Sequence, residues 1–425
     1  MLVKTMDLKR ELNLIDVFSI TTGSMICSGL FILPGIAHAK AGPAAMLSYL
    51  LAGLLAIPAM LSAAELVTAM PKAGGIYYFV SRSMGYGTGT VAGFARWFSI
   101  SFKSAFALIG MGAYAALITD IPITVVALFS CIFFIAINLL GIKLVGRIQV
   151  FMVYGLLTIL FFYIVLGWPA ANMENFSPFY IDFRALLATA GFVFISYGGL
   201  LVVTGLAEEV KKPEQTIPLG MFLSLVVVGA FYALVVFVTT GVLETGLLEN
   251  SLTPVSEAAR TFMGPFGMVI LAIAAFLALI TTTNAGIASA SRYPLAMSRD
   301  GILPDVFQRV GHKYGTPYLS ILFTGGFMLL VILLLRLELL VEVASTILIL
   351  TYILVNLAVL IMRKTRPADY QPKFRAPFYP WLQLLGITGL GALIAEMGTI
   401  PILLSGLFIL AALAWYRFYA WPRLK

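Results

Sequence analysis

The first long apolar stretch of the chain contains the segment Thr22-Gly23-Ser24-Met25-Ile26-Cys27-Ser28-Gly29, and the sixth contains Ser196-Tyr197-Gly198-Gly199. Both segments combine glycine with small polar residues, which predicts an interruption in each helix. Backbone that leaves the helix at membrane depth is tolerated only where it is buried in protein or lines an aqueous cavity. Two interrupted helices at corresponding places in two halves of a chain are typical of secondary transporters, whose substrate site lies between the halves.

The composition is that of a membrane protein. Hydrophobic residues make up 61% of the 425 residues and charged residues only 11%, and the mean hydropathy is +1.01. Soluble domains carry about 25% charged residues, so the composition predicts an all-α polytopic membrane protein. The two cysteines, Cys27 and Cys131, give neither a disulfide framework nor metal-ligand spacing. The sequence offers no catalytic triad, metal cluster or phosphate loop, so we expect neither an enzyme nor a bound cofactor.

Twelve apolar stretches have roughly the 20 residues that a helix needs to cross a bilayer. They lie near residues 16–40, 44–69, 88–118, 121–140, 147–168, 185–210, 217–242, 264–291, 317–336, 339–362, 379–397 and 400–419. The links between them are short and are either polar or rich in Gly and Pro. The chain is therefore expected to fold as twelve membrane-spanning helices.

The distribution of basic residues predicts the orientation. With the N-terminus in the cytoplasm, 21 of the 27 Lys and Arg residues fall in inner segments and 4 in outer segments, while Arg96 and Lys103 lie within the stretch at 88–118. This bias places both termini in the cytoplasm of a multi-pass protein of the plasma (inner) membrane. It also accounts for the net charge of +8. The basic residues are spread over many loops, so a nucleic-acid partner is not expected.

The two breaks offer the polar groups that an α-amino acid requires. N–H groups after the first break lie at the positive end of a half-helix and suit a carboxylate, and carbonyl groups at both breaks suit an ammonium group. The groups concerned are the N–H groups of Ser28, Gly29 and Leu30 and the carbonyl groups of Thr21, Thr22, Ile195 and Ser196. A glycine in a membrane helix more often serves close packing, but two clusters at related positions favour a site.

Asn284 lies midway along the stretch at 264–291, a costly depth for a polar group, and either lines a cavity or is a satisfied packing residue. Ser289 and Ser291 are candidate sodium ligands, although ordinary helix positions are the favoured interpretation. The candidate substrate-binding residues are Thr22, Gly23, Cys27, Ser28, Gly29, Ile195, Ser196, Tyr197, Gly198, Gly199 and Asn284.

Four segments resemble the amino acid–polyamine–organocation (APC) superfamily, in the order in which that superfamily has them. They are Thr22 to Phe31; Ala64-Glu65-Leu66 with Pro71 to Tyr78; Ala207 to Pro213 with Ile217-Pro218; and Ser291-Arg292 with Ser298 to Pro304 and Gly315-Thr316-Pro317. The resemblance implies a LeuT-like fold, with five helices in residues 1–168, five inverted helices in residues 185–363 and two accessory helices in residues 379–425. It also implies amino acid transport by alternating access.

The sequence departs from the superfamily in three places. Cys27 stands where glycine is usual, Leu201 is not acidic, and residues 150–167 lack the lysine that replaces a sodium ion in some relatives. Lys103 lies near the middle of the stretch at 88–118, where a charge costs about 2.5–3.5 kcal/mol and is expected to face the protein interior. Lys103 is therefore the candidate coupling residue, with a proton preferred over sodium as the coupling ion.

Three functions remain as alternatives. The favoured one is an exchanger or proton-coupled symporter for amino acids, expected to be neutral because no acidic residue lies near either break. The second is a polyamine or organocation transporter of the same fold, and the third is a channel. The expected partners are the amino acid substrate and the lipid bilayer, and the oligomeric state is left open.

Overall fold

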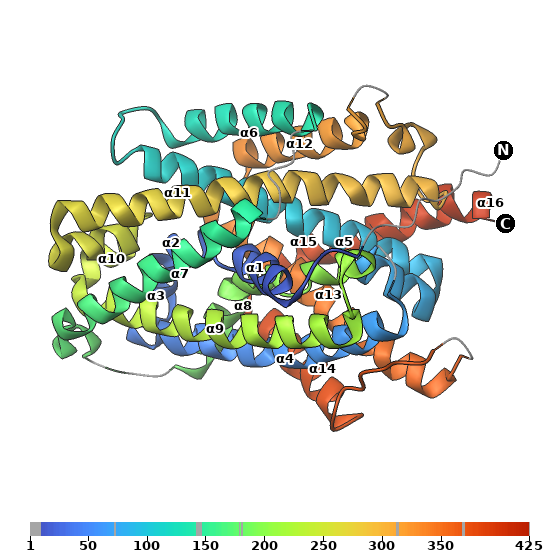
Figure 1. The fold of residues 1–425 in the computed structure, drawn as a ribbon, viewed down its shortest axis with the longest axis horizontal. Coiled ribbons are helices and arrows are strands. Elements are labelled where there is room, and N and C mark those ends of the chain that lie inside the picture. The colour runs from blue at the N-terminus through green and yellow to red at the C-terminus, as the bar shows by residue number, and fades with distance from the viewer. Residues whose placement is uncertain are drawn as a thin grey trace.

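The computed structural model describes residues 10–71, 74–141, 147–177, 179, 182–311, 314–367 and 370–424. Within these ranges the chain is helical and forms no β-strand; Leu12 and Val210 form a single parallel bridge. Most helices run along the length of the bundle, with α10 at one end and α16 at the other (Figure 1). We refer to these as the α10 end and the α16 end.

The helices of the first part surround a short, divided segment at the start of the chain. Asn13 and Asp16 form a capping box, in which each side chain accepts a hydrogen bond from the backbone N–H of the other residue, and this fixes the first turn. The elements are α1 (Leu14–Met25), α2 (Ser28–Phe31), α3 (Leu33–Ala41), η1 (Gly42–Ala44), α4 (Ala45–Ala69), α5 (Gly75–Ala115), α6 (Ile123–Leu139), α7 (Arg147–Gly167), η2 (Trp168–Ala170) and η3 (Met173–Phe176).

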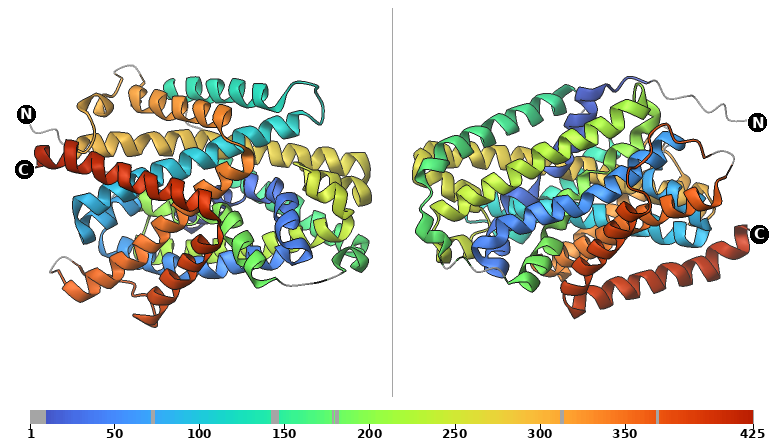
Figure 2. Two further views of the ribbon diagram at one scale, coloured as in Figure 1. Left: turned by 180° about the vertical axis from the view of Figure 1, so that it is seen from behind. Right: turned by 90° about the horizontal axis from the view of Figure 1, so that it is seen from below.

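The second part begins with another divided segment and ends with two helices on the outside of the bundle (Figure 2). Its elements are α8 (Phe183–Val193), η4 (Phe194–Gly199), η5 (Val202–Glu209), α9 (Pro213–Val242), α10 (Thr245–Asn250), α11 (Pro254–Arg299), η6 (Asp305–Gln308), α12 (Tyr318–Leu334), α13 (Leu337–Thr365), α14 (Trp381–Glu396), α15 (Thr399–Trp415), η7 (Tyr416–Ala420) and α16 (Trp421–Leu424).

The described part of the chain contains eight helical segments that are long and apolar enough to cross a membrane, together with four shorter apolar helices, α1, α6, α12 and α14. The chain is therefore a polytopic membrane protein, as the composition predicts. Two helices extend well beyond their apolar stretches: α5 begins at Gly75 and α11 at Pro254. Each bends at a glycine with positive φ, Gly85 in α5 and Gly264 in α11. Hydropathy detects only the apolar portion of such helices.

The packing places α5 at the centre of the molecule. Its most extensive contacts are with α11 and α13, and α9 packs against both α4 and α1. The broken segment between α1 and α2 and the segment formed by η4 and η5 lie among these helices, and both are buried for most of their length. The fold thus encloses the two sequence segments that were singled out above.

Candidate functional site

The break in the first membrane segment is confirmed and lies at Ile26 and Cys27. Helix α1 ends at Met25, Ile26 is extended (φ −72°, ψ 94°), and Cys27 has φ −146° and ψ −148° before α2 begins at Ser28. Because φ of Cys27 is negative, this position does not require the glycine that the superfamily usually has. The Leu30 N–H donates to the Cys27 carbonyl at 3.0 Å, and the Ile26 N–H donates to the Thr22 carbonyl at 2.8 Å. The Ile26 N–H group thus completes the last turn of α1, and the Cys27 carbonyl completes the first turn of α2.

The second segment differs from its prediction. An open interruption was expected at residues 196–199, but the chain remains helical there and tightens into a 3₁₀ helix, η4, followed by a turn and a second 3₁₀ helix, η5. Glycine pairs are compatible with both an open loop and a tight helix, and the surrounding side chains determine which forms. A stretch of 3₁₀ helix within a long helix often marks a hinge.

Two glycines allow the segments to touch. A Cβ on Gly29 would lie 2.1 Å from Ser196 Oγ, and a Cβ on Gly199 would lie 2.3 Å from the carbonyl oxygen of Ser24. Both separations are far below van der Waals contact, so only glycine fits at either position. Ser196 Oγ is buried and has no hydrogen-bond partner within the described part of the chain. The structure therefore brings the two predicted segments into direct contact.

Buried tyrosines from three helices bind carbonyl groups at this contact. Tyr49 of α4 donates to the Gly29 carbonyl at 2.9 Å, and Tyr232 of α9 donates to the Met25 carbonyl at 2.7 Å. Tyr352 of α13 donates to the carbonyl of Tyr197 at 2.7 Å. Carbonyls freed from the helical ladder and buried without a partner would destabilise the fold, so these hydroxyl groups make the irregular backbone possible.

Two cations on α5 bind one carbonyl from each segment. Lys103 Nζ donates to the Ser24 carbonyl at 2.6 Å, and Arg96 donates to the Gly198 carbonyl at 3.2 Å. They lie two helical turns apart on the same face of α5, and Lys103 and Arg96 are only 9% and 2% exposed. The predicted interior position of Lys103 is confirmed. Neither cation has a carboxylate within ion-pair distance among the residues that the structure describes.

Arg96 is not among the site residues expected from the sequence. The available signal was its seven-residue spacing from Lys103, which places two charges on one helical face deep in an apolar stretch. No sequence pattern marks the three tyrosines as residues that bind carbonyl groups, because a tyrosine in a membrane helix is equally compatible with simple packing.

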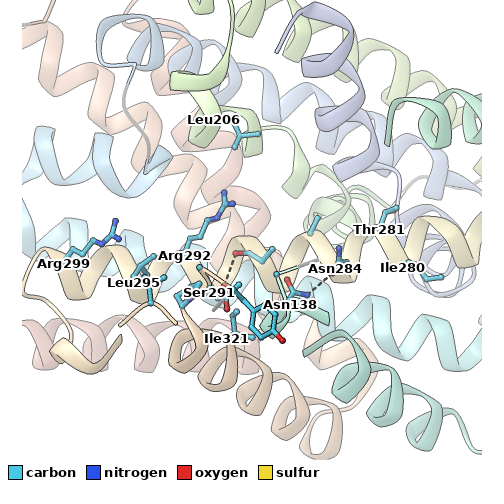
Figure 3. A pocket seen from close by; sticks show the side chains of 18 of the residues that line it. Asn138, Leu206, Ile280, Thr281, Asn284, Ser291, Arg292, Leu295, Arg299 and Ile321 are labelled. Atoms are coloured by element: carbon cyan, nitrogen blue, oxygen red, sulfur yellow. Dashed lines mark hydrogen bonds between the residues drawn. The ribbon is translucent and has the colours of Figure 1, made fainter. Parts of the chain in front are cut away.

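Three cavities lie near the broken segments. One of about 220 Å³ reaches Gly23 and Ile26 from between α7 and α11; the other two are called the smaller and the larger cavity below. The smaller, of about 280 Å³, reaches Ser24, Arg96 and Leu201 and extends to Gly74 at the start of α5. The larger, of about 810 Å³, lies between α6, α7, α11 and α12 (Figure 3). Asn284 lines the larger cavity, where its Oδ1 accepts a hydrogen bond from Asn138 at 2.9 Å. It therefore lines a cavity, as one interpretation expected, and it is also hydrogen-bonded.

The two serines considered as sodium ligands line different cavities. Ser289 lines the smaller cavity and Ser291 the larger. Ser291 Oγ donates to the Ala288 carbonyl of its own helix at 3.0 Å. A hydroxyl that binds back to its helix is a common arrangement in membrane helices. The structure does not bring the two serines to one point.

The α10 end is closed over the contact. Lys40 of α3 pairs with Glu342 of α13 at 2.9 Å, and His38 of α3 lies 3.1 Å from Glu249 of α10. Helix α10 also covers α3 so closely that a Cβ on Gly35 would lie 2.4 Å from a carbonyl oxygen of Leu248. The smaller cavity, in contrast, extends toward the α16 end through Gly74. The described residues thus cover the contact at the α10 end, whereas the smaller cavity reaches it from the α16 end.

Glu65 joins helices at the α16 end. Its carboxylate is fully buried and binds the Arg363 guanidinium, the Tyr370 hydroxyl at 2.7 Å and the Ala376 N–H at 2.8 Å. Burial and the Glu65 carboxylate raise the pKa of Tyr370, so its hydroxyl remains a donor. Nearby, Tyr77 donates to Asp300 at 2.5 Å and joins α5 to the end of α11. These contacts hold the α16 end together and do not reach the broken segments.

The protein is polytopic and helical, two irregular segments touch at its centre, and a cavity reaches them from the α16 end. These features define a membrane transporter. The amino acid permease family model matches residues 12–419 of this chain. The chain is therefore a member of the amino acid permease family, within the APC superfamily, and is not an enzyme.

Individual relatives are similar to most of the chain at low identity. The branched-chain amino acid permease of Bacillus subtilis is 27% identical over 97% of this chain and 93% of its own length. The serine/threonine exchanger of the same organism is 27% identical over 96% of this chain and 95% of its own. Its methylthioribose transporter is 27% identical over 90% of this chain and 87% of its own. Relatives at this distance thus act on chemically different solutes.

Proposed function

We propose that this chain is a secondary transporter of neutral amino acids that works by alternating access. In this proposal, the twelve apolar helices form two inverted sets of five, in residues 1–168 and 185–363, and two accessory helices follow in residues 379–425. The eight long and four shorter apolar helices support that number of spans. The closed α10 end and the smaller cavity at the α16 end correspond to an inward-facing conformation.

The contact between Gly29 and Ser196 is the observation that carries the proposal. The close approach of two buried, irregular segments leaves their backbone groups near one another, where a carboxylate and an ammonium group can be bound together. Ser196 Oγ is buried without a partner at this point and provides one further polar group. In this proposal, the substrate enters as the two segments separate slightly.

The charges around the segments favour a neutral substrate. Arg96 and Lys103 place two cations beside the contact, without a carboxylate partner among the described residues. A cationic side chain or a polyamine would be repelled by both in a region of low polarity. Two of the relatives are named for branched-chain amino acids and for serine and threonine, which are neutral. The polyamine alternative is therefore disfavoured.

Lys103 is our candidate for coupling. Its ammonium group binds the Ser24 carbonyl at the end of α1, where it supplies a positive charge that a sodium ion would otherwise provide. Loss of its proton would leave that carbonyl without a charged donor and loosen α1. A proton is thus preferred over sodium as the coupling ion, and exchange remains the alternative mode.

Uptake by purified protein in liposomes tests the proposal. Radiolabelled L-leucine, L-serine and putrescine would be offered, with and without unlabelled amino acid inside and with and without a pH gradient. We expect uptake of at least one amino acid and none of putrescine. Uptake of putrescine alone would establish the polyamine alternative, and passive flux unaffected by solute on the other side would indicate a channel.

A further inference from the structure

The larger cavity contains a pair of arginines that the proposed transport cycle does not use. Arg292 and Arg299 lie seven residues apart on α11, and Figure 3 shows both side chains projecting from the same side of that helix. Both are exposed to the cavity and solvent. Neither forms a hydrogen bond or ion pair with another described residue. The cavity therefore carries two positive charges at one wall.

Among the described residues, the remaining lining of the cavity consists of apolar, glycine and uncharged polar residues and includes no acidic side chain. A guanidinium group has a planar set of donors that matches a carboxylate or a phosphate. The cavity thus has the chemistry of an anion site.

The cavity also suits the side chain of an amino acid. Leu295 and Ile321 provide apolar surface in the same cavity. Basic residues that only fix the orientation of a membrane protein do not need to line a cavity, because their influence on orientation depends only on the side of the membrane on which they lie.

The larger cavity adjoins the smaller one. Leu206, Ala285, Ala288 and Arg292 line both, and the smaller cavity reaches Ser24 and Arg96 at the broken segments. A solute that leaves the contact toward the α16 end would therefore meet Arg292 next.

We propose that the larger cavity is a second, cytoplasmic binding site for the transported amino acid, in which Arg292 and Arg299 bind its carboxylate. This inference rests on the function proposed above. Because both guanidinium groups are hydrated, the site binds weakly and exchanges rapidly with the cytoplasm. It raises the local concentration of amino acid at the inner opening and thereby increases the apparent affinity on that side alone.

Thiol labelling tests the anion site without reference to transport. Ala285 is exposed and lines both cavities, so the Ala285→Cys variant places a thiol in the shared part of the cavities, two helical turns from Arg292 on α11. Its rates of reaction with a sulfonate-bearing and a trimethylammonium-bearing methanethiosulfonate would be compared. The native Cys27 and Cys131 are buried, and protein without the new cysteine gives the background.

We expect the anionic reagent to be favoured over the cationic one by roughly tenfold, the size of effect that two nearby charges produce in a partly aqueous site. Arg292→Gln together with Arg299→Gln should remove this preference. Arg417→Gln should leave it unchanged, because Arg417 is exposed but does not line the cavity. Equal rates for the two reagents in the protein with both arginines would overturn the proposal.

Transport measured from each side tests the identity of the anion. In proteoliposomes of one orientation, the concentration of L-serine or L-leucine that gives half-maximal exchange would be measured inside and outside. We expect Arg292→Gln to raise the inside value at least fivefold and to leave the outside value unchanged. Unchanged values on both sides, or equal increases, would overturn the assignment to amino acids.

Lipid composition separates a carboxylate from a lipid phosphate. Labelling would be repeated in discs of phosphatidylcholine alone and with phosphatidylglycerol. The proposal requires the same preference in both and its reduction by added amino acid. Suppression by phosphatidylglycerol would show that a lipid headgroup occupies the cavity instead. If the wild type moves no amino acid, both the function and this assignment fail, while the labelling still shows whether the cavity attracts anions.

Discussion

Replacing Gly29 with alanine tests whether the contact between the broken segments is required for transport. The new Cβ would lie 2.1 Å from Ser196 Oγ, 2.8 Å from its Cβ and 3.1 Å from its Cα. Favourable contacts between carbon atoms occur at about 3.5–4.0 Å, so the segments must separate by roughly 1 Å. Rotation of the serine side chain cannot relieve the contacts with Cβ and Cα.

The expected cost follows from overpacking of a buried site. Insertion of one carbon into a well-packed core costs about 1–3 kcal/mol. This corresponds to roughly a 5- to 150-fold change in the population of the conformation in which the segments touch. We expect amino acid uptake to fall at least tenfold, while the amount of folded protein in the membrane, measured by fluorescence-detected size exclusion, remains near that of the wild type.

Two further variants make the reasoning refutable. Gly391→Ala is the matched control, because a Cβ at this glycine of α14 meets nothing within 4 Å, and transport should be unchanged. Ser196→Gly removes both side-chain atoms that oppose the new methyl group, so the double variant Gly29→Ala, Ser196→Gly should recover part of the lost uptake. Normal uptake by Gly29→Ala alone, or no recovery in the double variant although Ser196→Gly alone is active, would refute the reasoning.

Three other predictions concern charge. Lys103→Gln should flatten the pH dependence of uptake if Lys103 carries the coupling proton; an unchanged profile at normal rates would exclude that role, and inactivity at every pH would favour a structural one. Arg363→Ala leaves the buried Glu65 carboxylate without its cation and should lower the free energy of unfolding by about 3–5 kcal/mol, measured by thermal unfolding. Lys373→Ala removes an exposed ion pair with Glu214 and should lower it by at most about 1 kcal/mol. Isoamylamine, which is leucine without its carboxylate, should not raise the melting temperature where L-leucine does; equal shifts would restore the polyamine alternative.

The sequence predicted the class of protein and the positions of the two irregular segments better than it predicted the local geometry of those segments. The composition and the apolar stretches predicted a polytopic helical protein, and Gly23 to Gly29 marked the first break because glycine and small polar residues weaken a helix. The second segment was predicted as an open interruption, whereas it is a 3₁₀ helix. Its shape depends on contacts with Tyr232 and Tyr352, and such long-range contacts leave no local pattern.

For Lys103 and Arg96, too, some features follow from the local sequence and others depend on long-range packing. The depth of Lys103 in an apolar stretch predicted an interior position, because the cost of an exposed charge there depends only on depth. Its acceptor, the Ser24 carbonyl, and the parallel role of Arg96 depend on how α5 packs against two other segments. Neither could be obtained from residue types alone.

The two close contacts are reciprocal: in one, a glycine of the first segment meets a serine of the second, and in the other, a serine of the first meets a glycine of the second. At the first contact the available room is shared by the side chains at positions 29 and 196, whereas at the second contact Gly199 faces main-chain atoms of Ser24 and Met25. A larger side chain at position 29 must be accompanied by a smaller one at position 196. A larger side chain at position 199 requires the backbone at residue 24 to move, and a smaller side chain at residue 24 would not make room for it. In the evolution of this chain, residues 29 and 196 are thus free to change together. The glycine at 199 faces a main-chain atom, so position 199 should change more slowly than position 29.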